Sequence, residues 1–307
     1  MSDLSMLING LKVTAEKGAT FERRNPLDGS VATRAPAASA ADAVMAVEAA
    51  AEAFKTWGET GPGARRALLL KAADALESKT PRFIEAMAAE TGATAMWAGF
   101  NCMLAAGMIR EAAGLTTQIS GELIPSDVPG SMAMAVRQPA GVVLGIAPWN
   151  APVILGVRAI CVPIACGNTV VLKGSENCPR THQLIIESFE DAGFPPGVVN
   201  YITNAPADAG AVVEAMVSHP AVRRVNFTGS TKVGKIIAAT CARYLKPVVL
   251  ELGGKAPMVV LDDADLDDAV NGAAFGCFAN SGQICMSTER IIVDSKIADA
   301  FVKKFAD

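Results

Sequence analysis

The pattern of apolar and polar positions begins with short strands and continues into a block of helices. Residues 1–36 hold short apolar runs broken by turn dipeptides, which are typical of two or three short strands or an extended arm. Beyond them, apolar residues recur at three- and four-residue spacing, which predicts helices at about 40–57, 62–78, 81–91 and 94–115. Ser39, with the acidic Asp42 three residues later, is expected to cap the first helix.

The stretch 116–137 has a different character. Two strand-like runs, 118–125 and 131–137, flank a turn that contains proline and glycine, and they predict an exposed hairpin within about 117–139. Exposed strand edges are often used in oligomers, so the hairpin is a candidate contact between subunits.

After Pro139 strands and helices alternate. Apolar, β-branched runs predict strands at 141–147, 169–173, 198–202, 223–228 and 248–252, with helices between them. This alternation predicts an α/β fold with a doubly wound parallel sheet covered on both faces. A second α/β run begins near Ala256, and its last helix, 297–306, has no strand after it. We interpret that run as the first part of a second α/β domain within which the sequence stops.

Composition narrows the function. The chain is 51% hydrophobic and 19% charged with a net charge of −4 and no basic cluster, so we expect no nucleic acid partner. The start has no signal-peptide pattern, and proline or polar residues interrupt every apolar window, so we expect a cytoplasmic protein with no membrane partner. Seven cysteines without a CxxC pair and only two histidines predict no metal site.

Three residues could carry covalent chemistry. Cys285 could be a nucleophile, with Glu251, in a glycine-containing turn upstream, as its base. The alternative is that a lone cysteine is more often a small buried hydrophobe. Asn150 follows the first predicted strand and could stabilise an oxyanion, and a helix N-cap would explain it equally well.

Two further strand ends suit a nucleotide. Gly229-Ser230-Thr231 opens a helix and offers backbone N–H groups to a phosphate, although a plain helix cap is common and the GxGxxG fingerprint is absent. Lys173 and Glu176 could bind ribose hydroxyls, and the Glu176 carboxylate would repel a 2′-phosphate, which favours NAD over NADP. The alternatives are a snorkelling lysine and an ordinary exposed glutamate.

Taken in order, five motifs resemble the NAD(P)-dependent aldehyde dehydrogenase superfamily: APWN at 147–150, KGSE at 173–176, FTGST at 227–231, LELGGK at 250–255 and GQICMS at 282–287. Finer stretches, including FKTW at 54–57 and WAGFN at 97–101, are similar to its salicylaldehyde dehydrogenase branch, with benzaldehyde and vanillin dehydrogenases close by.

The resemblance implies NAD-dependent oxidation of a small aromatic aldehyde to the carboxylic acid, in a homodimer or homotetramer. It divides the chain into an NAD-binding domain at 1–253, with the N-terminal arm and the hairpin, and an incomplete catalytic domain at 254–307. Because family members continue beyond Asp307, an inactive or nucleotide-binding-only fragment is an alternative, as is a benzaldehyde or vanillin dehydrogenase. A relative that passes the acyl group to coenzyme A is disfavoured by Glu251, a base suited to activating water.

The resemblance also implies residue roles: Cys285 as nucleophile, Glu251 as general base and Asn150 as oxyanion donor. The implied cofactor-binding positions are Ile146, Ala147, Pro148, Trp149, Lys173, Ser175, Glu176, Gly229, Ser230, Val233, Leu252 and Gly253.

Candidate substrate-pocket residues are Trp97, Phe100, Ala151 and Arg158. Arg158 follows Asn150 by about two helical turns and could face the same tunnel, while helix packing and a salt bridge explain these residues equally well. At Gly174 many relatives have proline, a departure expected to change turn stiffness more than chemistry.

Overall fold

The computed structural model describes residues 4–307, which form two compact units. The first unit runs to Thr228 and resumes at Lys232–Leu250, and the second comprises Gly229–Thr231 and Glu251–Asp307. Each unit is described by itself below. The assignment of 1–253 and 254–307 to separate functions stays a prediction.

Four short strands open the first unit: β1 (Met6–Ile8), β2 (Leu11–Val13), β3 (Thr20–Arg24) and β4 (Val31–Pro36). β3 and β4 form an antiparallel pair of their own. β1 pairs antiparallel with β2 on one side and with β9 (Val199–Ile202) on the other. The predicted arm is therefore in part an edge of the main sheet, because the three residues of β1 are buried against it.

Four helices follow at the positions that periodicity predicts: α1 (Ala40–Trp57), α2 (Pro62–Ser78), α3 (Thr80–Thr91) and α4 (Ala95–Leu115). The cap predicted for α1 is confirmed as a capping box. The Asp42 N–H donates to Ser39 Oγ at 3.3 Å, and the Ser39 N–H donates to the Asp42 carboxylate at 2.8 Å.

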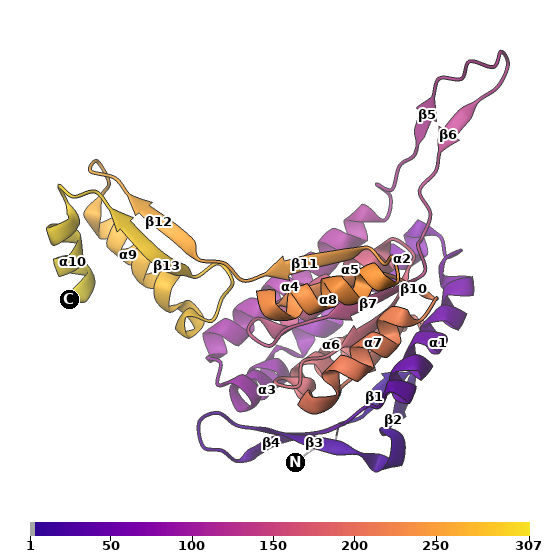
Figure 1. Ribbon diagram of the computed structural model, residues 1–307, viewed down its shortest axis with the longest axis horizontal. Helices are drawn as coiled ribbons and strands as arrows, with labels where there is room; N and C mark the ends of the chain where they lie inside the picture. The colour runs from indigo at the N-terminus through magenta and orange to yellow at the C-terminus, as the bar shows by residue number, and fades with distance from the viewer. Residues whose placement is uncertain (1–3) are drawn as a thin grey trace. The chain divides into compact units, whose positions relative to one another are not determined.

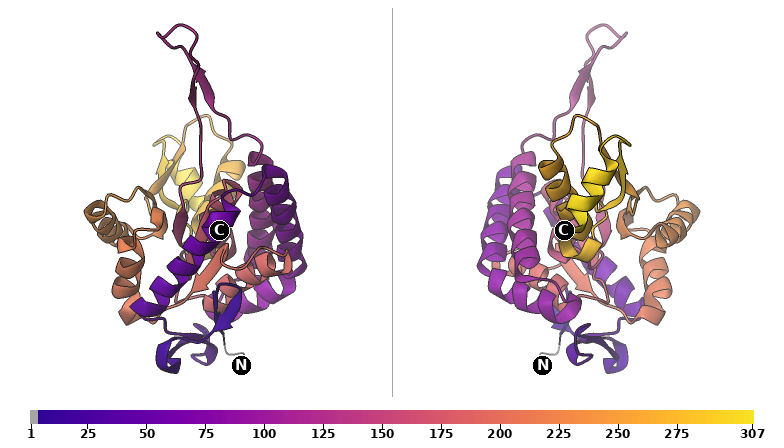
Figure 2. Two further views of the ribbon diagram at one scale, coloured as in Figure 1. Left: turned by 90° about the vertical axis from the view of Figure 1, so that its right-hand side faces the viewer. Right: turned by 90° about the vertical axis from the view of Figure 1, so that its left-hand side faces the viewer.

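The predicted hairpin is also confirmed. β5 (Glu122–Ile124) pairs antiparallel with β6 (Ala133–Ala135), and together they project from the body of the first unit (Figures 1 and 2). Its apolar side chains face solvent, with Leu123 at 74% and Met132 at 75% exposed.

The main sheet has the strand order β11-β10-β7-β8-β9-β1-β2. Its inner strands are β7 (Val142–Ile146), β8 (Thr169–Lys173) and β10 (Val222–Gly229), with β11 (Val248–Leu252) at one edge. β7 pairs parallel with β8 and β10, and β8 with β9, which confirms the predicted doubly wound parallel core. Two findings correct the prediction: the β1–β2 edge is antiparallel, and β11 is not buried on both faces, since Val249 is 65% exposed on this edge strand.

Helices cover both faces of the sheet (Figure 2). α1 packs on β7, β8 and β9 beside α7 (Ala209–Ser218), while α5 (Pro152–Ala165) and α6 (Pro179–Asp191) contact β7, β8 and β9 from the opposite face. α2 and α4 pack on α5, and α2 and α3 pack on α6. α8 (Thr231–Arg243) follows β10.

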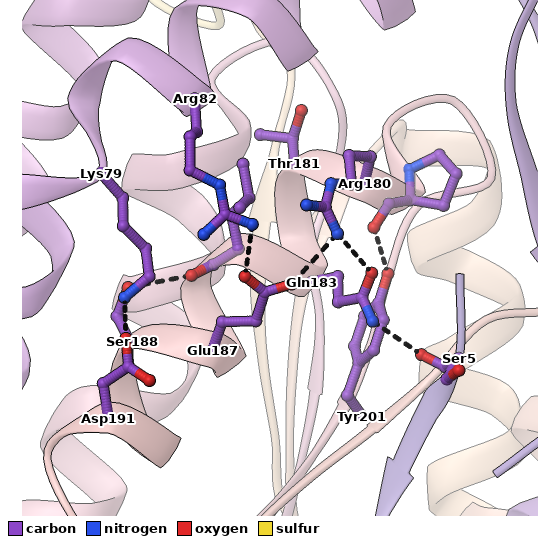
Figure 3. A network of polar contacts seen from close by, with 12 residues as sticks. Ser5, Lys79, Arg82, Arg180, Thr181, Gln183, Glu187, Ser188, Asp191 and Tyr201 are labelled. Carbon is purple, nitrogen blue, oxygen red and sulfur yellow. Dashed lines mark hydrogen bonds and ion pairs between the residues drawn. The ribbon is translucent and has the colours of Figure 1, made fainter. Parts of the chain in front are cut away.

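Polar contacts fix α6 in register (Figure 3). The Glu187 carboxylate accepts hydrogen bonds from Arg82 on α3 at 2.7 Å and from Arg180 at 3.0 Å. Gln183 donates to the Ser5 carbonyl at 3.2 Å. These bonds join α6 to α3 and to the N-terminal segment.

The second unit contains β12 (Ala256–Val260), α9 (Leu266–Phe278), β13 (Thr288–Val293) and α10 (Ala298–Ala306). β12 and β13 are parallel, and Val260, Ala273 and Phe301 form the centre of a small core. This arrangement confirms the predicted second α/β run.

Candidate functional site

Three strand ends of the first unit lie side by side. In the parallel ladder Ile146 at the end of β7 is paired with Lys173 of β8 on one side and with Phe227 of β10 on the other. The chain leaves β7 first toward β8 and β9 and later returns to the other side through β10. Such a switch in direction, at the carboxyl ends of parallel strands, is where α/β sheets bind ligands.

The loop that follows β7 carries Asn150. The Asn150 carbonyl accepts a hydrogen bond from Trp97 Nε1 of α4 at 3.0 Å. Ala151, and not Asn150, occupies the N-cap position of α5, and no side chain caps that helix. Asn150 therefore lies one residue before the N-cap position of α5.

The loop that follows β8 carries an ion pair. Lys173 Nζ lies 3.3 Å from the Glu176 carboxylate, and the two side chains are 7% and 32% exposed. Lys173 is therefore a buried cation rather than a snorkelling one, and Glu176 is its partner rather than an isolated surface charge. An amine and a carboxylate at this edge are a donor and acceptor set that fits ribose hydroxyls.

The remaining cofactor-binding candidates differ in burial. Ile146, Ala147 and Ser175 are buried, Pro148, Trp149, Gly229 and Leu252 are partly buried, and Ser230, Val233 and Gly253 are exposed. Ser230 joins the last residue of β10 to the first residue of α8, the helix start that the sequence assigns to a phosphate.

The candidate pocket residues lie on α4 and at the start of α5, two helices in contact. Trp97 and Phe100 are stacked, with ring centroids 5.5 Å apart. Trp97 also packs on the cluster of Ala151, Ile154 and Leu155. Arg158 is exposed, on the α5 face that also carries Ala151, because seven residues are close to two helical turns.

Cys285 differs from every other cysteine of the chain, because it is the one exposed thiol among the seven. Burial raises the pKa of Cys102 to about 11 and that of Cys161 to about 12, and it also raises the pKa values of Cys166, Cys178 and Cys241. Thiols of this kind are poor nucleophiles, since the thiolate is the reactive form.

Backbone geometry displays Cys285. The Ser287 N–H donates to the Ile284 carbonyl at 3.0 Å, which places Cys285 and Met286 at the two corners of a turn. Just before it, Asn280, Ser281 and Gly282 all have positive φ, at 49°, 56° and 72°. Left-handed backbone at two non-glycine residues is costly and tends to occur at functional sites. Glu251, in the same unit, is exposed at the end of β11.

Sequence reasoning missed the residues behind the Lys173–Glu176 loop, since no local pattern marks them. The Ser175 N–H donates to Nδ1 of the buried His182 at 3.0 Å. Gly174 donates its N–H to the Ile202 carbonyl at 2.9 Å, and a Cβ there would lie 2.8 Å from the Tyr201 ring. A side chain at Gly174 would therefore meet the Tyr201 ring, a steric effect that adds to the expected change in turn stiffness.

Among residues 4–307 no helix is long and apolar enough to cross a membrane. Within the same residues no group of three or more His, Cys, Asp or Glu side chains could hold a metal ion.

Comparison with known proteins agrees with these motifs. The model of the aldehyde dehydrogenase family matches residues 13–307. A vanillin dehydrogenase of Pseudomonas fluorescens is 61% identical over 306 residues, covering 100% of this chain and 63% of its own length. The crystal structure of a salicylaldehyde dehydrogenase from Pseudomonas putida G7 complexed with salicylaldehyde is 51% identical, with a TM-score of 0.98 over 99% of this chain and 63% of that one.

A more distant neighbour, PnpE from Pseudomonas sp. WBC-3 in complex with nicotinamide adenine dinucleotide, is 37% identical with a TM-score of 0.94, covering 99% of this chain and 62% of that one. The chain thus spans somewhat less than two thirds of the relatives it matches. Because the family model covers nearly the whole chain, residues 13–307, the chain belongs to the aldehyde dehydrogenase family.

Proposed function

We propose that the protein containing this chain oxidises an aromatic aldehyde of the salicylaldehyde kind to its carboxylic acid, with NAD as the oxidant. The observation that carries the proposal is the exposure of Cys285, just after the left-handed segment 280–282, while the other cysteines are buried or half-buried. A single accessible thiol in a chain of this family is the natural candidate for the attacking group.

In this scheme the Cys285 thiolate attacks the aldehyde carbon and forms a thiohemiacetal. The Asn150 amide and the Cys285 N–H donate to the oxyanion, and each such donor is worth about 3 kcal/mol in other enzymes. One feature of the structure supports this role for Asn150: its carbonyl accepts a hydrogen bond from Trp97 Nε1, which holds the backbone of the loop after β7.

Cofactor binding is assigned to the strand ends. Lys173 and Glu176 would hold the adenosine ribose, and the backbone around Ser230 would hold the pyrophosphate at the start of α8. The Glu176 carboxylate disfavours a 2′-phosphate, which supports NAD over NADP. When bound, NAD supplies a hydride acceptor, and Cys285 is left as a thioester.

Glu251 is assigned the second half of the reaction. It would take a proton from water, and the resulting hydroxide would hydrolyse the thioester to the carboxylic acid. Its exposed carboxylate at the end of β11 is compatible with contact to solvent water. This role argues against transfer of the acyl group to coenzyme A.

The proposed substrate class rests on side chains of α4 and α5 and on the substrates for which the relatives are named. The Trp97–Phe100 stack offers a flat apolar surface to an aromatic ring, and Arg158 offers a cation to a ring hydroxyl. Relatives named for vanillin and for salicylaldehyde both act on hydroxylated aromatic aldehydes, which supports a ring hydroxyl in the substrate of this protein. The exposed hairpin supports a homodimer or homotetramer.

The test is Cys285→Ser in the complete protein, with Cys277→Ser as a matched control from the same unit. NADH formation is followed at 340 nm with salicylaldehyde, benzaldehyde and vanillin. We expect a loss of at least about a thousandfold in kcat for Cys285→Ser, because the serine hydroxyl is not ionised, and little change for Cys277→Ser. Near-normal oxidation by Cys285→Ser would overturn the assignment.

A second candidate arises because the chain spans 63% of its relatives. The 307-residue chain by itself could bind NAD without turnover. Calorimetry of NAD binding, alongside the NADH assay on the same chain, separates the two: binding without NADH formation supports a nucleotide-binding fragment.

A further inference from the structure

His182 is a fully buried residue in the first turns of α6, three residues after Pro179, and it is one of only two histidines in the chain. None of the roles assigned above to the catalytic, cofactor or pocket residues involves it. It does, however, face two of the loops that carry those residues.

The hydrogen bonds of the ring fix its tautomer. The Ser175 N–H can only donate, so Nδ1, at 3.0 Å, must accept and carries no proton. On the other side of the ring lies the first turn of α5: a Cβ at Gly156 would lie 3.5 Å from Nε2, and the Pro152 backbone, one turn earlier, acts to raise the pKa of His182. A proline backbone offers only its carbonyl to a ring N–H. A neutral imidazole that accepts at Nδ1 carries its proton on Nε2, on the side of the ring that faces the first turn of α5.

The surroundings keep the ring neutral. Burial lowers the pKa of His182 to about 4, and the nearby Lys173 ammonium acts in the same direction, while Glu176 opposes them. Cys178 Sγ lies 3.8 Å from Nδ1, and burial raises the pKa of that thiol. In a protonated imidazole Nδ1 would carry a proton that points at the Ser175 N–H. The hydrogen bond from Ser175 to Nδ1 therefore requires the neutral ring.

Close packing leaves no room for a substitute partner. A Cβ at Gly156 of α5 would lie 2.5 Å from Ile185 and 3.2 Å from the His182 ring, so α5 touches α6 at this point because of the glycine. On the other side of the loop the Tyr201 ring covers Gly174, and Tyr201 Oη donates to the Pro179 carbonyl at 2.6 Å. The imidazole is a side-chain link between the two loops, in addition to the backbone bond from the Ala147 N–H to the Lys173 carbonyl at 3.5 Å.

We propose that His182 is a positioning residue that holds the loop starting α5 after Asn150 and the loop from Lys173 to Glu176 in one fixed relation. One loop is assigned the oxyanion donor and the other the adenosine ribose, so the ring would set the distance between the reacting end and the anchored end of the cofactor. The catalytic and cofactor roles of the two loops rest on the proposed function, whereas the contacts of His182 with both loops do not.

Three substitutions divide the bridge into its halves. In His182→Asn the amide oxygen can replace Nδ1 and accept from Ser175, but nothing reaches the Pro152 carbonyl. His182→Gln can place its NH2 near the position of Nε2 and keep the Pro152 bond. His182→Leu removes both bonds. Ser188→Ala is the matched control, because Ser188 is buried on the same helix and donates only to the Leu184 carbonyl at 2.9 Å.

The complete protein is assayed for NAD binding by calorimetry and for kcat at saturating substrate. We expect His182→Asn to keep NAD affinity within about twofold and to lower kcat about tenfold, since the start of α5 then loses its contact with the ring N–H and is free to shift. His182→Gln should instead weaken NAD binding about tenfold, and His182→Leu should do both. The control should change neither. Equal losses in both quantities for Asn and Gln, or no loss in Leu, would overturn the proposal.

A third measurement is independent of catalysis. Two-bond ¹H–¹⁵N correlation spectra of histidine-labelled protein report the tautomer, with the His182 signal assigned by its loss in the Gln variant. The Nε2–H form, unchanged between pH 5 and pH 8, supports the bridge, and the Nδ1–H form overturns it. If wild-type protein shows this tautomer but neither binds NAD nor oxidises aldehydes, the proposed function fails while the bridge stands.

Discussion

The buried neutral His182 should make the stability of the protein depend on pH in a way that one substitution removes. The pKa of His182 is about 4 in the folded protein and 6.5 in the unfolded chain. At a pH between these values the ring binds a proton in the unfolded state but not in the native state. Stability contributed by the neutral ring is therefore complete above pH 6.5 and is lost as the pH falls toward 4.

The magnitude follows from the two pKa values. Each unit of pKa difference corresponds to about 1.4 kcal/mol, so the native state loses about 2 kcal/mol through this group by pH 5 and about 3 kcal/mol by pH 4. A glutamine at the position cannot titrate, while all other titrating groups remain in place. The difference in unfolding free energy between wild type and His182→Gln, followed against pH, therefore isolates the contribution of His182 titration.

The assay is urea unfolding of both proteins, followed by far-UV circular dichroism, at pH 7.5, 6.0, 5.0 and 4.5. The advantage of wild type over His182→Gln should shrink by about 2 kcal/mol between pH 7.5 and pH 5.0. A difference that stays constant over this range would show that the ring titrates alike in both states, and would refute its burial as a neutral group.

Three other changes test the site. Gly174→Pro should lower the unfolding free energy by about 2 to 4 kcal/mol in thermal or urea unfolding, because it removes the N–H that binds Ile202 and forces a ring atom against Tyr201, and Gly174→Ala should cost less. Glu251→Gln should give one rapid equivalent of NADH per site in stopped flow and then slow at least about a hundredfold, because the thioester is not hydrolysed; unchanged steady-state turnover would contradict its role as base. Arg158→Leu should raise KM about tenfold for salicylaldehyde and hardly at all for benzaldehyde, which lacks the hydroxyl, and equal effects on both would assign Arg158 a purely structural role.

The parts of the fold that sequence predicts best are those fixed by local pattern. The capping box of α1 and the alternation from β7 to α8 follow from residue spacing, and the structure has them within a residue or two. The antiparallel edge formed by β1 and β2 could not be predicted, because strand partners separated by nearly two hundred residues leave no periodic signal: Leu7 pairs with Tyr201. Tertiary pairing, and not propensity, decides such an edge.

The same division applies to the candidate site. Residues assigned to contact ligands, such as Asn150 and Glu176, can be predicted from the sequence. A polar residue or a glycine at the end of an apolar strand has few purely structural reasons to be there. Residues that hold them are apolar or aromatic neighbours, or a histidine within a helix, and their role depends on contacts that sequence does not contain. The Ser175 N–H shows why: its partner His182 lies seven positions away, beyond the start of the next helix. Only the packing of α5 on α6 brings Gly156 and the first turn of α5 to the other side of the ring. If this is how the two loops are held, substitutions that keep every ligand contact but change the imidazole should separate affinity for the cofactor from the rate of the reaction.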